Sequence, residues 1–267
     1  MGYGDEIMVT GFARIAKQKY PEFQVVIGDR KKGIIVDSPI FYNNPNITKS
    51  SEISLEIKKV WIENYSNNRP YIKKQNEEKF YWNMEYRPIA GDLFFKKEEV
   101  EKSNLFYKKM ELIKGNKKVV FIEPSRIQKI FDKRDWGEDN WQQLISSLKE
   151  EILFIQSVHN DSKIFNDAIP FSADFRTACS MLNLCDAFIG WEGGFSHAAA
   201  ALKKKAVVLF GGWIHPKTTG YFMHSNFYID IEGSPCGVKK NCEHCNKCRD
   251  LMSVDKVIKK LKEILFI

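Results

Sequence analysis

Short apolar runs alternate with segments of helical spacing through the second half of the chain. The runs that predict buried strands are 118–122, 152–155, 187–190 and 206–210. The segments whose apolar residues recur at helical spacing are 140–148, 175–184, 196–202 and 254–265. Buried strands separated by helices are typical of a parallel sheet covered on both faces, so this half predicts an α/β domain.

The first hundred residues show a weaker pattern. An amphipathic helix is predicted over 7–19, and it ends at Tyr20-Pro21 because a proline disfavours helix in the residue before it. Short strands are predicted over 23–28 and 33–36.

A hinge is predicted at 114–117, where Lys-Gly-Asn-Lys separates the two patterns. We therefore expect an N-terminal domain over 1–113 and a C-terminal domain over 114–267. The C-terminal domain includes a Cys-rich segment over 236–248.

Composition favours a folded protein with a moderate basic excess. With 43% hydrophobic and 13% aromatic residues, the chain has enough apolar material for a core. The net charge of +7 comes from 41 basic and 34 acidic residues spread along the chain. A solvated basic face accounts for this excess, and attraction to a phosphate-bearing ligand is the sharper interpretation. No stripe of alternating basic and aromatic residues indicates nucleic acid, so nucleic-acid binding is not expected.

The sequence predicts neither a secretory signal nor a membrane span. The N-terminus has no basic start followed by an apolar stretch, and no window of 18 apolar residues occurs. We therefore expect a cytoplasmic protein, with peripheral contact at the inner membrane left open. In a reducing compartment the six cysteines are expected to serve a purpose other than disulfides.

The most informative stretch joins the strand predicted at 187–190 to the helix predicted at 196–202. Gly193 and Gly194 turn the chain there, and a glycine turn at a helix N-terminus lets backbone N–H groups hold a phosphate. Glu192 suits sugar hydroxyls, because a carboxylate accepts two hydrogen bonds. Ser196 and His197 add donors. The alternative is a tightly packed crossover without a ligand.

This stretch carries a resemblance to a known family. The order acidic-x-Gly-Phe-Ser-His, followed by an alanine-rich helix in 192–202, resembles the donor-site motif of the ADP-heptose:lipopolysaccharide heptosyltransferase family. Similar segments occur in the family's order at 4–21, 133–141 and 210–220. The resemblance covers the C-terminal half well and the N-terminal half only over its first 21 residues.

The resemblance implies a GT-B fold, in which two Rossmann-like domains enclose the active site in the cleft between them. It also implies an inverting transfer of heptose or a related sugar. The donor is expected to be a nucleoside-diphosphate sugar, ADP-heptose above all, and the acceptor a glycan or lipopolysaccharide-type molecule.

Such a transfer needs one general base and no covalent intermediate. The resemblance gives that role to Asp5, and the alternative is that Asp5 caps the N-terminal helix. No cofactor is expected for transfer, since enzymes of this fold generally need no metal and the sequence has no Asp-x-Asp pair.

The resemblance also implies which residues bind the donor. A basic side chain within 133–141 is expected to reach the phosphates, and the loop after 206–210 is expected to lie close by. The expected donor-binding residues are Lys133, Arg134, Glu192, Gly193, Gly194, Phe195, Ser196, His197, Lys217, Thr218 and Thr219.

The sequence departs from the family pattern at three points. Glu192-Gly193 stands where the family has Asp-Thr or Asp-Ser, which leaves the donor sugar open. Arg134 stands where the family favours Lys, with Lys133 one position earlier. No strand is predicted before the helix that opens near Gly4, so we expect a shortened N-terminal domain without its first strand.

Cysteines give a second signal, the pattern C-x5-C-x2-C-x2-C formed by Cys236, Cys242, Cys245 and Cys248. Overlapping C-x-x-C units in a reducing compartment indicate thiolate binding of Zn²⁺ or iron, and His244 could replace one thiolate. Some members of the wider family carry a cysteine-bound iron in a similar place. Four ligands would close the coordination shell, so a structural role is expected, with free thiols as the alternative.

Two further functions stay open on the sequence alone. The first is a catalytically silent protein of the same fold that binds a nucleotide sugar or a partner. The second is a metal-knuckle module that binds nucleic acid through basic loops, which steep salt dependence of binding would reveal.

Overall fold

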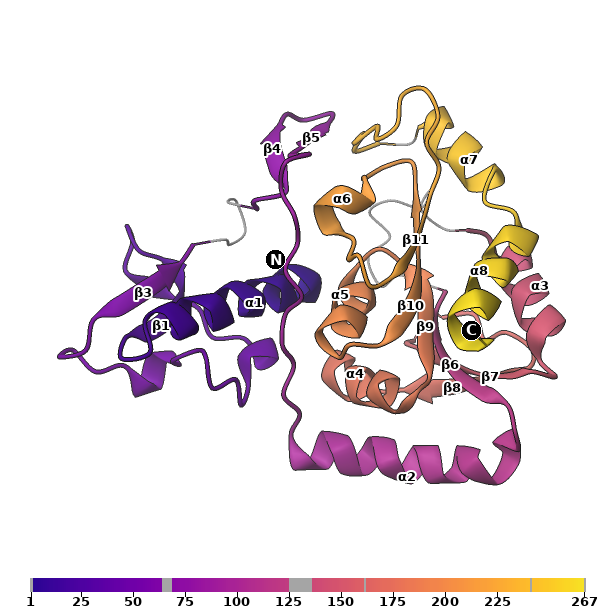
Figure 1. Ribbon diagram of the computed structural model, residues 1–267, viewed down its shortest axis with the longest axis horizontal. Helices are drawn as coiled ribbons and strands as arrows, with labels where there is room; N and C mark the ends of the chain where they lie inside the picture. Colours follow the sequence, from indigo (N-terminus) through magenta and orange to yellow (C-terminus); the bar gives the residue numbers. More distant parts are fainter. Residues whose placement is uncertain (1, 64–68, 125–135, 161, 241, 267) are drawn as a thin grey trace.

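A computed structural model describes residues 2–63, 69–124, 136–160, 162–240 and 242–266 (Figure 1). The two halves predicted from the sequence are both present as α/β units. Among the described residues, no helix is both long and apolar enough to cross a membrane.

The C-terminal half is built on a six-stranded sheet. Its strands are β6 (Lys118–Glu123), β7 (Ile152–Val158), β8 (Ala168–Ser172), β9 (Ala187–Trp191), β10 (Lys205–Gly211) and β11 (Ser225–Tyr228). They pair in the order β11-β10-β9-β6-β7-β8, and every pairing is parallel. Counted along the chain this is the doubly wound order 3-2-1-4-5-6, whose reversal point lies between β6 and β9. Ligands bind at the carboxyl end of such a reversal point, which is where β9 leads into the predicted glycine turn.

Helices cover both faces of this sheet (Figure 1). One face carries α3 (Glu138–Leu148) and α8 (Val254–Phe266), and the other carries α4 (Phe175–Leu184) and α5 (Gly194–Ala201). Alternate residues of one strand point to opposite faces. Val120 accordingly packs with the α3 and α8 side, and Phe121 packs with the α4 and α5 side. Two short helices, α6 (Pro216–Thr219) and α7 (Glu243–Asp250), follow β10 and β11.

The N-terminal half is smaller. It contains α1 (Tyr3–Lys19), β1 (Gln24–Asp29), β2 (Ile34–Ile35) and β3 (Lys59–Ile62), with 3₁₀ turns at Pro39–Phe41 and Ser50–Glu52. The sheet order is β2-β1-β3, with β1 parallel to β3 and antiparallel to β2. No strand precedes α1 in the described residues.

A hairpin and a long helix connect the halves. The hairpin consists of β4 (Ile72–Gln75) and β5 (Phe80–Trp82), and the helix is α2 (Lys97–Lys114). The sequence pattern predicted neither. Helix α2 ends at the predicted hinge, where Gly115 adopts φ 55°.

Packing does not separate the halves at residue 114. The Ser103 hydroxyl of α2 donates to the Thr177 carbonyl of α4 (3.2 Å), so α2 lies on the C-terminal half. One buried apolar cluster also includes Ile7 and Ile27 from the N-terminal half and Phe188 from the C-terminal half. The boundary between 113 and 114 therefore stays a prediction.

Candidate functional site

The predicted glycine turn connects β9 to α5. Strand β9 is buried throughout, whereas Glu192, Gly193 and Gly194 are only half-buried. A methyl group on Gly194 would lie 3.1 Å from the ring of Phe175, so only glycine fits this close approach without displacing the ring. The backbone of the turn is therefore partly accessible, while Gly194 packs tightly against the ring of Phe175.

No N-cap side chain caps α5 in the structure as described. The Ser196 hydroxyl accepts from the Gly193 N–H (3.0 Å) and donates to the Gly193 carbonyl (2.8 Å). This internal pairing uses the serine that was expected to act as a ligand donor. Because the first-turn N–H groups of a helix have no partner inside it, those of Gly194 and Phe195 lie at the positive end of the helix dipole.

The N-terminus of α1 meets the N-terminus of α5. A methyl group on Gly4 would lie 2.8 Å from Cδ2 of His197 and 3.5 Å from Cα of Gly194. Two positive helix ends therefore converge at one point, which makes that point favourable for an anionic group. The segment that carries Asp5 and the turn 192–197 therefore lie side by side.

Asp5 belongs to the first turn of α1 rather than to a loop before it. The N-cap residue is Gly2, so Asp5 is not the cap that the alternative interpretation supposed. Its side chain is 13% exposed, and its two oxygens have different partners. The Tyr71 hydroxyl donates to Oδ1 (2.5 Å), and the Arg69 Nε lies 3.1 Å from Oδ2 in an ion pair without hydrogen-bond geometry.

Tyr71 and Arg69 are site residues that sequence reasoning missed. Both precede β4 in a segment without a clear hydrophobic period, and they contact Asp5 across more than sixty positions of the chain. Burial raises the pKa of Tyr71, and the negative charge of Asp5 raises it further. The phenol is therefore protonated and serves as a hydrogen-bond donor to the carboxylate.

His197 is buried and links the turn to the loop after α6. Its Nδ1 lies 2.8 Å from the Tyr221 hydroxyl, and its Nε2 lies 3.9 Å from Glu192 Oε1. Burial lowers the pKa of His197, although the nearby charges of Glu192 and Asp5 oppose this effect. A neutral ring with its proton on Nε2 fits both contacts. His197 thus contacts Tyr221 and lies beside Glu192, and its expected contact with the donor stays a prediction.

The other expected donor-binding residues differ in what they offer. Phe195 is a core side chain that packs on Phe175 (4.8 Å between ring centroids), so only its backbone faces the turn. The Thr218 hydroxyl donates to the His215 carbonyl (2.7 Å), and Thr219 is buried. Lys217 is exposed.

Lys133 and Arg134 lie outside the described residues. Their expected contact with the donor phosphates, like the other donor contacts, stays a prediction.

A cavity of about 700 Å³ lies between the loop 37–49 and the starts of α2 and α4. Its wall includes Ser38, whose hydroxyl donates to Glu6, the neighbour of Asp5. The ring of Tyr42 in the same wall has three cations near its face. The wall of the cavity carries both signs of charge, with Lys49, Lys96, Lys102 and Arg176 beside Asp37, Glu98, Glu99 and Asp174, so the cavity suits a polar molecule.

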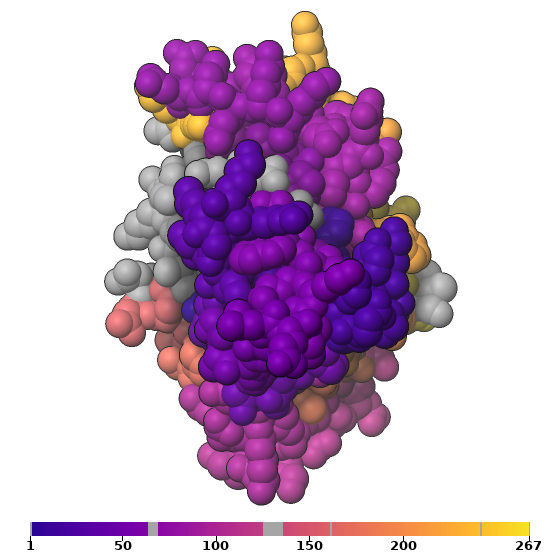
Figure 2. Space-filling model, turned by 90° about the vertical axis from the view of Figure 1, so that its left-hand side faces the viewer, coloured from indigo at the N-terminus to yellow at the C-terminus, as the bar shows by residue number. Residues whose placement is uncertain are grey.

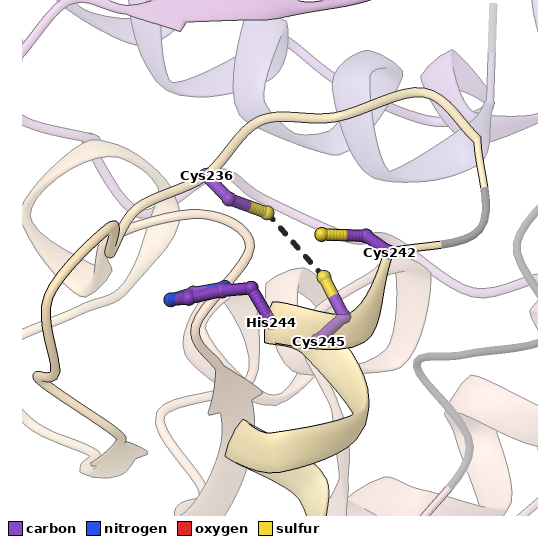
Figure 3. Close-up of side chains that lie close together, drawn as sticks. All are labelled: Cys236, Cys242, His244 and Cys245. Atoms are coloured by element: carbon purple, nitrogen blue, oxygen red, sulfur yellow. Dashed lines mark hydrogen bonds between the residues drawn. The ribbon is translucent and has the colours of Figure 1, made fainter.

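The cysteine cluster follows β11 in the chain. Figure 3 shows its side chains. Cys236, Cys242, His244 and Cys245 each offer a ligand atom, and these atoms lie within 4.8 Å of one another. A tetrahedral zinc site with Zn–S bonds of about 2.3 Å needs sulfurs about 3.8 Å apart, so this donor set fits a metal ion. Figure 3 shows the three sulfurs converging, whereas the His244 ring points aside.

A short contact makes two thiols of this cluster differ in proton affinity, because it lowers the pKa of Cys236 and raises the pKa of Cys245. The sulfurs of Cys236 and Cys245 are 3.3 Å apart, and hydrogen bonding from Cys245 lowers the pKa of Cys236 to about 5. Thiolate is the form that binds metal. Cys236 is therefore ready to act as a ligand.

Cys248, the fourth predicted ligand, is outside this group. Its sulfur lies 3.7 Å from Nε2 and 3.8 Å from Nδ1 of His244, on a fully buried side chain. The described arrangement thus brings three of the four predicted cysteines together with His244, the substitute that the sequence suggested.

The fold and site define a class of protein. A doubly wound sheet presents a glycine turn and helix N-terminus to a second α/β unit, which is the arrangement of GT-B glycosyltransferases. The chain belongs to glycosyltransferase family 9 (heptosyltransferase), whose family model matches residues 77–247, more than half of its length. The chain is therefore a glycosyltransferase. Asp5 precedes the matched range.

Solved structures confirm the fold. The glycosyl transferase family 9 structure from Veillonella parvula has a TM-score of 0.65 at 11% identity, covering 100% of this chain and 95% of that one. The iron-containing dodecameric glycosyltransferase TibC from enterotoxigenic E. coli has a TM-score of 0.60 at 14% identity, covering 99% and 74%. None of the curated proteins matches the sequence.

Proposed function

We propose that this glycosyltransferase moves heptose or a related sugar from ADP-heptose to a glycan or lipopolysaccharide-type acceptor, with inversion at the transferred carbon. One observation carries the proposal: a carboxylate, Asp5, lies at the point where two helix N-termini converge. A base and an anion site side by side are what a single displacement on a sugar diphosphate requires.

In this mechanism the leaving diphosphate rests on the N-terminus of α5. The N–H groups of Gly194 and Phe195 stabilise the charge that develops as the bond from sugar to phosphate breaks. Helix α1 adds its positive end from the other side. The backbone provides this stabilisation, so the proposed step needs no divalent ion.

Asp5 takes the proton of the acceptor hydroxyl as that oxygen attacks the sugar. Tyr71 and Arg69 fix the carboxylate in one orientation, because each holds one of its oxygens. Glu192, which lies beside His197, accepts hydrogen bonds from hydroxyl groups of the transferred sugar.

The cavity at the loop 37–49 is the proposed entry of the acceptor. Its wall includes Ser38, whose hydroxyl donates to Glu6, the residue that follows Asp5 in the sequence. Lys96 lies 4.4 Å from the centroid of the Tyr42 ring and could pair with an acidic group of the acceptor.

We also propose that the cysteine cluster holds a structural Zn²⁺ or iron ion. The donor set fits a tetrahedral site, and the structurally similar TibC is described as iron-containing. Ligation of this kind stabilises the local fold and leaves no coordination position for a substrate.

Thermal denaturation with ADP-, GDP-, UDP- and CMP-sugars tests the proposed donor. A ligand that binds only the folded state stabilises it by about 2.7 kcal/mol at a concentration of 100 times its Kd. The proposal predicts that ADP-sugars raise the melting temperature most. If none of the four classes changes it, the proposed donor is wrong.

A further inference from the structure

We propose that the cysteine cluster acts as a clamp on the hairpin β4–β5, so that binding of metal to the cluster keeps Tyr71 and Arg69 on Asp5. The clamp itself is independent of the proposed function, and only its effect on turnover rests on that function. In both views the hairpin lies against the segment that carries the cluster, at the top of Figures 1 and 2.

The first link joins the cluster to β5. The Phe80 N–H donates to the Gly237 carbonyl (2.9 Å), and the Lys239 N–H donates to the Glu78 carbonyl (2.7 Å). Lys79 and Val238 form an antiparallel bridge between these two bonds. The segment that follows Cys236 thus pairs with the hairpin through one isolated β-bridge and two backbone hydrogen bonds.

Gly237 shows how closely the two segments approach. It adopts φ +64°, and a methyl group there would lie 2.2 Å from the Phe80 carbonyl oxygen. Only glycine allows this conformation and this contact without displacing β5. The position of Cys236, one residue earlier, is therefore tied to the position of the hairpin.

The second link is a pair of tryptophans. The Trp82 indole N–H donates to the Trp213 carbonyl (2.9 Å), and the Trp213 indole N–H donates to the Val238 carbonyl (2.8 Å). The two rings meet edge to face with centroids 4.7 Å apart. Because Trp213 lies two residues after the end of β10, the pair anchors the hairpin to the C-terminal sheet.

The third link runs from the hairpin to the reaction centre. The Asn83 N–H donates to the Tyr71 carbonyl (2.8 Å), and the rings of Tyr71 and Trp82 stack with centroids 6.4 Å apart. The Tyr71 hydroxyl then donates to Asp5. A shift of β5 would therefore move the group that orients the carboxylate.

In this proposal a metal ion makes the series of contacts from the cluster through the hairpin to Asp5 rigid. An isolated two-stranded hairpin is only marginally stable in water. Cys236 lies on the segment that pairs with the hairpin, whereas Cys242 and Cys245 lie at the start of α7. Metal–thiolate bonds would join these two segments, and metal binding at such sites contributes directly to folding.

Amide hydrogen exchange on the full-length protein tests the clamp, with Zn²⁺ as the metal probe. The protein is compared as loaded, after removal of metal by a chelator, and after Zn²⁺ is added back. We expect removal to speed exchange in peptides covering 70–83 at least tenfold, and Zn²⁺ to reverse this. Peptides covering β6 should not change.

Unchanged exchange at 70–83 after loss of metal would overturn the proposal. Equal acceleration in β6 would overturn it too, because the metal would then hold the whole fold. Neither readout needs a substrate, so this part of the test stands even if no sugar transfer is found. Cys242→Ser should reproduce the effect of the chelator, and Cys185→Ser, at a buried cysteine outside the cluster, serves as its control.

A second variant keeps the test decisive if Cys242→Ser does not fold. Trp82→Phe removes the indole donor and retains an aromatic ring. In metal-loaded protein it should speed exchange at 70–83 and lower the turnover number while the Kd for ADP is unchanged. Normal exchange together with normal turnover in this variant would contradict the path through Trp82.

Discussion

At the scale of single residues, the account depends on how Asp5 is held. Its two carboxylate oxygens contact different groups, so the side chain has one orientation, and it lies beside the converging ends of α1 and α5. Orientation matters because a general base must lie within hydrogen-bond reach of the proton it takes.

Asp5→Asn should lower the turnover number by about 10²–10⁴ while the Kd for ADP is unchanged. The amide retains the shape of the side chain and cannot accept the proton. Steady-state kinetics and calorimetric titration with ADP measure the two quantities. Asp29→Asn, at the end of β1, is the control and should leave both unchanged. Full activity in Asp5→Asn would exclude it as the base.

His224 predicts a dependence of stability on pH. Burial lowers its pKa from 6.5 to about 4, and burial shifts the pKa of His197 in the same direction. Below pH 6.5 the unfolded chain takes up a proton that the folded chain does not, so the free energy of unfolding falls as the pH decreases toward 4. At about 1.4 kcal/mol per pH unit, His224 contributes a loss of about 3 kcal/mol.

Urea denaturation at pH 7.5 and pH 4.5 measures this loss. His224→Gln should lose less stability than the unmodified protein between these two values, because glutamine does not titrate. His159→Gln is the control, because His159 is a histidine away from His224 and His197. An equal loss in all three proteins would show that His224 does not titrate on unfolding.

The sequence predicted some site residues and could not predict others, for a physical reason. Glu192, Gly193 and Gly194 follow each other at a strand end, so a local pattern was sufficient to find them. Tyr71 and Arg69 reach Asp5 through a tertiary contact that no local pattern encodes. Ser196 was also found by its place in this pattern; its hydroxyl pairs with Gly193 in the structure, and its contact with the donor stays a prediction.

At the scale of elements, the contact between α1 and α5 sets the site. Both helices present their first turns, and glycine at position 4 allows them to touch. The distance between these two turns determines whether the base and the diphosphate can act on the same sugar.

Gly4→Ala should separate the two helices and lower the turnover number at least tenfold, because the new methyl group would lie 2.8 Å from His197. Gly2→Ala is a matched control on the same helix, since a methyl group there meets nothing within 4 Å. Steady-state kinetics of both variants measure their turnover numbers. Equal activity would show that the close approach of α1 to α5 is not needed.

Elements with an apolar period were predicted well, including α1, β1 and β2 of the weaker N-terminal pattern, whereas β3, the hairpin β4–β5, α2, β8 and β11 were not predicted. The strands β6, β7, β9 and β10 and the helices α3, α4, α5 and α8 all have such a period, and all are present within a few residues of their predicted bounds. Helix α2 was missed because polar and apolar residues share the side that packs on the fold. Glu99 and Ser103 are buried on it together with Met110, and Phe106 packs on Phe171, so the apolar repeat is too short to stand out in the sequence.

At the scale of the whole molecule, one arginine ties three parts of the chain together. Arg176 of α4 donates to both carboxylate oxygens of Glu99 on α2 (2.7 and 2.9 Å). It also donates to the carbonyls of Pro39 and Phe94. The buried guanidinium group of Arg176 therefore joins the loop at Pro39, the start of α2 and the C-terminal half.

Arg176→Met should reduce the free energy of unfolding by about 3–5 kcal/mol, because it leaves the carboxylate of Glu99 buried without its positively charged partner. The double variant Arg176→Met/Glu99→Leu should recover much of that loss, since no unpaired charge remains. Urea denaturation of the two variants measures both values. A double variant as unstable as the single one would show that the pair itself, rather than the orphaned charge, accounts for the loss.

The central claim is that a donor diphosphate binds between α1 and α5, on the N-terminus of α5. A crystal structure of the protein soaked with ADP tests it most directly. The account predicts diphosphate oxygens within hydrogen-bond distance of the Gly194 and Phe195 N–H groups, with Asp5 on the same side. A diphosphate bound at any other place in the molecule would contradict it.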